Sequence, residues 1–182
     1  MTTLAKIKSY LGITDSTSDA VLTELIANIS AFIEKVLGRK IVKLTDPNRY
    51  TEYFDGTREL LVKNFPVIVV DSIKYNSGTL SSPSWQTIDA QNYAVYLGEG
   101  KIVGMGSFPK GYQNIQVIYN GGFDTVPDDI ELIAKQLVAK AFEQRRAQGK
   151  ATEALGGARI DWKDEISTEQ KMILEKYKNL SI

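Results

Sequence analysis

The spacing of apolar residues changes twice along this chain, and no other feature restricts its fold as strongly. Residues 1–38 and 124–147 carry apolar side chains at the three- and four-residue intervals of amphipathic helices. Between them, residues 40–123 are rich in Val, Ile, Tyr and Thr and are punctuated by Gly, Pro, Asn and Asp, as strands and turns are. We therefore expect an α+β protein. The N-terminal helices and a long helix of the C-terminal half form a small bundle, and an antiparallel β-subdomain is inserted between them.

The helices are predicted over residues 2–12, 19–38 and 128–147. The second has apolar residues at helical spacing, namely Leu22, Leu25, Ile26, Ile29, Ile33 and Val36. Three more widen this stripe beyond one packing face: Val21, Phe32 and Leu37. Two interpretations stay open. Either the helix is central and is buried by its own chain, or part of the stripe faces a neighbouring subunit, with those three residues as the interface candidates.

Within the β-subdomain, the alternating segments predict short strands. They are expected near residues 50–54, 59–62, 67–75, 86–88, 93–96, 101–103 and 115–119. Residues 97–100, Leu-Gly-Glu-Gly, fit the tight turn of a hairpin. Residues 76–84 have few apolar side chains and predict an exposed loop.

The C-terminal residues 150–182 differ from the rest in composition. They hold six basic and six acidic residues and few large apolar ones, and Gly156 and Gly157 interrupt any helix. Ser167 and Gln170 have the spacing of a capping box before a short terminal helix. The sequence therefore predicts a connecting domain over 1–149 and an extended C-terminal arm over 150–182.

Two amino acids are missing from the chain, and their absence excludes much chemistry. There is no Cys and no His, so zinc sites built from them, Ser-His-Asp triads and Cys-His dyads are excluded. Acidic and basic residues number 22 each, and a net charge of zero argues against a nonspecific nucleic-acid coat or a polybasic membrane binder. The composition favours a structural or binding role.

Motifs that could carry catalysis have simpler explanations. Residues 98–101, Gly-Glu-Gly-Lys, lack the earlier glycine of a phosphate loop, and Ile102 stands where Ser or Thr is needed. Asp128 and Asp129 suit the positive end of a helix dipole. A second acidic group, Asp161, Asp164 and Glu165, lacks the spacing of a calcium loop and fits a solvated arm. We expect no enzymatic activity, no metal and no cofactor.

Aromatic and basic residues alternate in two places, 49–54 and 110–112, as they do on nucleic-acid-binding faces. Glu52 and Asp55 lie among those cations and weaken the comparison. A small regulatory module that contacts nucleic acid through its β-sheet is the alternative function. The N-terminus has lysines within its apolar stretch, and no apolar run could span a bilayer, so we expect a cytosolic chain without membrane contact.

Several groups of residues, in order, carry a resemblance to a known family. They are Leu4 to Ile13 with Lys8, Tyr10, Leu11 and Gly12; Asp19, Leu22, Leu25 and Ile26; Tyr53, Asp55 and Gly56; Pro66, Val67, Val70, Ser72 and Ile73; Val117, Tyr119, Gly121, Gly122 and Phe123; and Pro127, Asp129 and Ile130. In this order and spacing the chain resembles the head–tail connector family of tailed bacteriophages, also called head-completion or adaptor proteins. Its strand region is longer than that of the minimal, mostly helical members.

The resemblance implies a function. Such proteins are not enzymes; they form a ring, usually of twelve copies, beneath the portal after DNA packaging, extend the DNA channel and help retain the genome. They present a surface to the next neck or tail-completion protein, and DNA passes through without tight binding. The implied location is the virion neck, after synthesis in the host bacterial cytoplasm.

In the resembled family the C-terminal segment reaches the portal, and this directs attention to the apolar residues of the arm. Gly156 and Gly157 would let the arm swing out. A lone tryptophan in a polar arm is typical of an interface hot spot. The expected docking residues are Ala158, Arg159, Ile160, Asp161, Trp162, Met172, Ile173 and Tyr177. The alternative is that Trp162 folds back onto its own domain.

Overall fold

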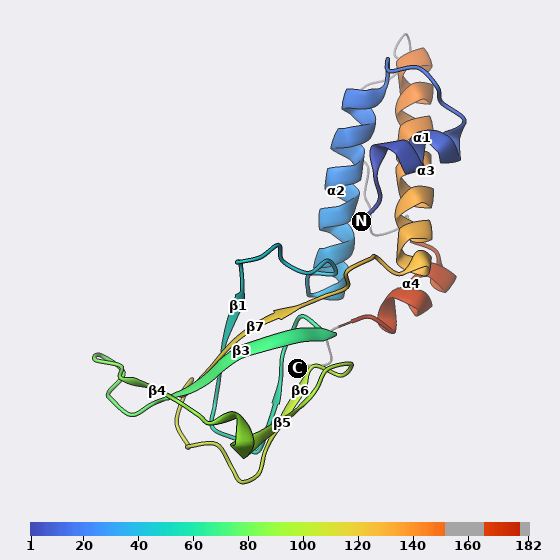
Figure 1. Cartoon of the computed structure of the whole chain (residues 1–182). Coiled ribbons are helices and arrows are strands. Elements are labelled where there is room, and N and C mark those ends of the chain that lie inside the picture. The colour runs from blue at the N-terminus through green and yellow to red at the C-terminus, as the bar shows by residue number, and fades with distance from the viewer. Residues whose placement is uncertain (152–165, 179–182) are drawn as a thin grey trace. The chain divides into compact units, whose positions relative to one another are not determined.

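The computed structural model describes residues 1–151 and 166–178, and these fall into two compact units. The helical unit comprises Met1–Gly38 and the described residues of Val126–Lys178, and the β unit comprises Arg39–Thr125 (Figure 1). Both breaks between the units fall where the apolar spacing changes. The predicted α+β class, with an antiparallel β-subdomain inserted between helices, is confirmed.

The helical unit contains four helices in the described ranges: α1 (Leu4–Leu11), α2 (Asp19–Leu37), α3 (Asp128–Ala151) and α4 (Thr168–Glu175). Local chemistry sets their ends. Thr3 caps α1, which therefore starts two residues later than predicted, and Gly38 ends α2 with a φ of 68°, a conformation that favours glycine. The Ser167–Gln170 capping box opens α4 as the sequence predicts.

The core of the helical unit is built from the apolar stripes of its helices. Ile7 of α1, Leu22 and Ile33 of α2, and Leu174 of α4 are buried together with much of α3. The buried α3 residues keep the helical spacing: Ile130, Ile133, Ala134, Leu137, Val138, Ala141 and Phe142. Burial of one face of each helix supplies most of the stability of such a bundle.

One carboxylate lies inside this apolar unit. Glu131 of α3 is 4% exposed, and its oxygens contact Lys6 Nζ at 2.8 Å and Lys135 Nζ at 3.2 Å. The hydrogen bond from Lys6 is the main cause that holds the pKa of Glu131 below its ordinary value, although burial opposes it. Glu131 therefore attaches the N-terminal helix α1 to α3 by charge as well as by packing.

The β unit contains two antiparallel sheets. One has the strand order β1-β7-β3-β4 and the other has the order β2-β6-β5. The strands are β1 (Tyr50–Phe54), β2 (Glu59–Leu61), β3 (Val67–Asn76), β4 (Trp85–Thr87), β5 (Tyr93–Tyr96), β6 (Lys101–Gly104) and β7 (Ile115–Gly121). A 3-10 turn, η1 (Ala90–Asn92), precedes β5.

The two sheets share one apolar core. Side chains of both meet there, including Leu60 of β2, Ile102 of β6, Ile73 of β3 and Val117 of β7. β1 and β2 follow one another directly, yet β1 pairs with β7 and β2 pairs with β6. The short connection between them therefore joins the two sheets and does not form a hairpin.

Candidate interaction surfaces

The predicted docking residues lie partly on α4. Ala158, Arg159, Ile160, Asp161 and Trp162 lie outside the described residues. On α4, Met172 is 67% exposed and Ile173 is half-buried. Met172 is therefore accessible for an external contact.

Tyr177, the remaining predicted docking residue, contacts its own chain. Its hydroxyl donates to the carboxylate of Asp129, with oxygen–oxygen distances of 2.9 and 3.0 Å. Burial, and then this bond, raise the pKa of Tyr177. Leu174 is buried, and Gln170 Nε2 donates to Gln136 Oε1 at 2.7 Å. These contacts fix α4 against α3.

The three interface candidates on α2 differ in burial. Val21 and Phe32 are half-buried, whereas Leu37 is completely buried within the chain. Leu37 lies one helical turn beyond Ile33 and continues the same buried row. The suggestion that Leu37 contacts a neighbouring subunit is therefore corrected, and Val21 and Phe32 remain the candidates.

An aromatic cluster lies at one end of the four-stranded sheet. The rings of Tyr53 and Trp85 are 5.8 Å apart, and Gln116 Nε2 donates to the Tyr53 hydroxyl at 3.0 Å. A hollow of about 190 Å³ beside them has no charged side chain in its lining: Tyr53, Asn76, Leu80, Pro83, Trp85, Tyr112 and Gln113. Its chemistry suits contact with another protein surface.

Arg49 of the predicted nucleic-acid segment is held by two acids of its own chain. Its guanidinium donates to Asp46 and to Asp71, and these bonds raise its pKa. Two carboxylates therefore compensate this cation, which weakens the alternative of a phosphate-binding sheet.

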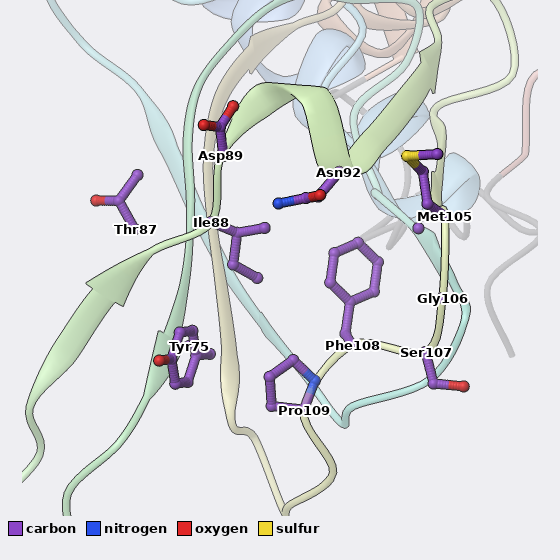
Figure 2. Close-up of a pocket in the computed structure, with 11 residues that line it drawn as sticks. Tyr75, Thr87, Ile88, Asp89, Asn92, Met105, Gly106, Ser107, Phe108 and Pro109 are labelled. Atoms are coloured by element: carbon purple, nitrogen blue, oxygen red, sulfur yellow. The ribbon is translucent and has the colours of Figure 1, made fainter.

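A larger cavity of about 540 Å³ lies beside η1 in the β unit. Figure 2 shows Ile88, Asn92 and Phe108 facing one another, with Met105 to one side of them. Tyr75 and Pro109 complete the apolar part of the lining, and Asp89 is its one charged residue. Sequence reasoning did not find this cavity, although it marked the preceding loop over residues 76–84 as exposed.

A buried polar cluster connects β1 to β7. The Tyr119 hydroxyl donates to Glu52 Oε1 at 2.5 Å and accepts the backbone N–H of Asn64 at 3.0 Å. Burial raises the pKa of Glu52, although the bond from Tyr119 opposes that shift. The Tyr119 hydroxyl, the Glu52 carboxylate and the Asn64 N–H are all hydrogen-bonded within the chain, so we interpret the cluster as part of the scaffold.

Arg39 is a second polar group in the core of the β unit. Its guanidinium lies 3.6 Å from the centre of the Phe65 ring, and the side chain is 5% exposed. Its three nitrogens have no hydrogen-bond partner among the described residues. Burial lowers its pKa to about 10, and the stacking on Phe65 compensates part of that cost.

Within 1–151 and 166–178, no group of three or more His, Cys, Asp or Glu residues is placed to hold a metal ion. No helix in those ranges is long and apolar enough to cross a bilayer.

The described residues thus form an α+β protein with an inserted antiparallel β unit, exposed apolar side chains and an uncharged hollow. The chain belongs to the head completion protein family, whose model matches residues 1–180. This membership gives it a structural role in completing a viral head.

Solved structures have the same fold. A chain from the "Neck of empty GTA particle computed with C6 symmetry" matches with a TM-score of 0.64 and 14% identity, over 100% of this chain and 91% of that one. A chain from the "Virion of native gene transfer agent (GTA) particle" matches with a TM-score of 0.59 and 15% identity, over the same shares. Comparison with curated protein sequences gives no match.

Proposed function

We propose that this protein is a non-enzymatic neck subunit that forms a ring under the portal. The observation that carries the proposal is the family match over residues 1–180. The similar neck of the gene transfer agent particle was computed with sixfold symmetry, which supports a ring arrangement, and we propose about twelve copies. The ring extends the DNA channel, helps to retain the packaged genome and joins head to tail.

The proposed partners are the portal protein above, further copies of this chain at the sides, and the next neck or tail-completion protein below. A channel for DNA needs no strong attraction to phosphate, and the net charge of zero is consistent with that. The protein is made in the host bacterial cytoplasm and acts in the virion neck.

We propose that residues 158–162 and Met172 dock onto the portal. Met172 is exposed on α4, whereas Leu174 and Tyr177 of the same segment are occupied within the helical unit. One face of α4 is thus attached to its own subunit and the other is accessible. Each contact can be weak, because repetition around a ring multiplies the affinity.

Point variants test this docking better than deletion of the C-terminal segment, since deletion would remove buried Leu174 from the core. We expect a double variant, Trp162→Ala with Met172→Ser, to fold normally and to lose at least tenfold in affinity for purified portal rings, measured by co-sedimentation. The matched control is Leu132→Ser, which changes an exposed apolar residue of α3. Portal binding at the unmodified level by the double variant would contradict this docking site.

A further inference from the structure

The loop between β3 and β4 has an ordered structure without an apolar core. Asn76 Oδ1 accepts the backbone N–H groups of Gly78 and Ser84, both at 2.9 Å. Ser77 N donates to the carbonyl of Ser84 at 2.8 Å, and Thr79 N donates to that of Ser82 at 3.1 Å. These bonds fix the loop, residues 77–84, which we term the β3–β4 tip. A loop that is already ordered loses little entropy when it binds.

The β3–β4 tip presents one large apolar side chain. Leu80 is 80% exposed, the largest exposed fraction among the large hydrophobic residues that the structure describes. No residue of the tip is charged, and its other side chains are mainly hydroxyls. A rigid, uncharged loop that exposes a leucine gains free energy when another surface covers it.

The cavity beside η1 has the properties of a receptor for such a tip. Its 540 Å³ lies in the range of pockets that take up ligands and is far larger than a packing defect. Ile88 and Phe108 form apolar walls, and Met105, 76% exposed, extends the apolar surface outward. The carboxylate of Asp89 can accept hydrogen bonds from hydroxyl groups.

Backbone contacts keep this cavity in shape. Met105 N donates to the carbonyl of Asn92 at 2.9 Å, and Phe108 N donates to that of Thr57 at 3.0 Å. Gly104, just before Met105, lets the chain fold back closely there, since a Cβ would lie 2.4 Å from the carbonyl oxygen of Gly106. The receptor is therefore preformed, like the tip.

The tip and the cavity lie at opposite ends of the same short strand, β4. The tip leads into β4 (Figure 1). Thr87, the last residue of β4, and the two residues after it line the cavity. The tip and the cavity both belong to the β unit. A closed ring requires each subunit to present two different, mutually complementary surfaces to its two neighbours. The tip offers a leucine and several hydroxyls, and the cavity offers apolar side chains beside the polar groups of Asp89, Asn92 and Ser107, so the two can form such a pair.

We propose that the β3–β4 tip of one copy inserts into the η1 cavity of the next copy. Leu80 then packs against Ile88 and the exposed Met105, above the nearly fully buried Phe108, and tip hydroxyls approach Asp89. This inference rests on the proposed ring and names the surfaces that join its subunits.

The chain contains no cysteine, so disulfide cross-linking can test this contact without background. We would mix two single variants, Leu80→Cys and Met105→Cys, with purified portal rings under mild oxidation. We expect a covalent dimer of the two variants at a yield at least tenfold above either variant alone, on a non-reducing gel. The control pair replaces Met105→Cys with Leu97→Cys, an exposed residue of the same unit outside the cavity.

The outcomes separate this inference from the proposed ring. Rings seen by electron microscopy without the Leu80–Met105 cross-link would overturn the tip contact and leave the ring intact. Absence of rings in the unmodified protein with its portal would overturn both. As a second readout, Leu80→Asp should weaken self-association at least tenfold, whereas Leu97→Asp should not; equal effects of the two would also contradict the contact.

Discussion

At the scale of single residues, two buried charges have opposite consequences for stability. Glu131 lies between Lys6 and Lys135, and these two cations stabilise its ionised form in the folded protein. Arg39 has an aromatic ring on its face but no hydrogen-bond partner among the described residues. The first charge attaches α1 to α3, and the second costs free energy at neutral pH.

We predict that Glu131→Gln lowers the free energy of unfolding by about 2 kcal/mol at pH 7. The pKa of Glu131 is lowered in the folded state, so its contribution is present above the ordinary value near 4.5 and is lost as pH falls through the folded value. The gap between variant and unmodified protein should therefore shrink in acid. Urea titrations at pH 7 and at a pH below the folded pKa of Glu131 measure this difference in unfolding free energy. Exposed Glu143→Gln is the control. A difference that does not change with pH would contradict the charge contact.

For Arg39→Met we predict an increase in the free energy of unfolding of about 1 kcal/mol at pH 7, because the charge without a hydrogen-bond partner is removed and the apolar stem is kept. The folded pKa, about 10, lies below the unfolded value. The unmodified protein should thus gain stability as pH rises above about 10, and the variant should not. Thermal unfolding across this range is the measurement; a loss of 2 kcal/mol or more would indicate a partner that Arg39 binds in solution.

At the scale of elements, local pattern identified the helices and strands, and distant contacts arranged them. The spacing of Leu22, Ile29 and Ile33 could predict α2, since burial repeats with the helical period. The separation of β1 and β2 into different sheets could not be predicted, because each pairs with a strand far along the chain. The η1 cavity was missed for the same reason: Phe108 is positioned by Thr57, about fifty residues away. Of the candidate site residues, Met172 is exposed and its docking role stays a prediction, whereas the burial of Leu37 depends on tertiary packing.

The stripe of α2 gives a prediction at this scale. If half-buried Val21 meets a neighbouring subunit, Val21→Asp should weaken self-association at least tenfold, since the new charge would be desolvated at the interface. Thr23→Asp, exposed on the same helix, is the control. Sedimentation measures association and circular dichroism measures folding. Loss of folding in step with association would assign Val21 to the core of its own subunit.

At the scale of the whole molecule, the charge distribution bears on DNA. Acidic and basic residues are equal in number, and the two carboxylates beside Arg49 compensate it. We predict no appreciable binding of duplex DNA by the isolated protein at physiological salt, measured by fluorescence anisotropy. Submicromolar affinity that falls steeply with salt would favour the regulatory, nucleic-acid-binding alternative.

We propose above that copies of this chain form a closed ring on the portal. Electron microscopy of purified portal rings, with and without the added protein, tests it most directly. We predict an additional closed ring, of about twelve copies, coaxial with the portal and open along its axis. Portal rings that stay bare at saturating protein, with the chain free as a monomer or dimer, would overturn the proposed ring.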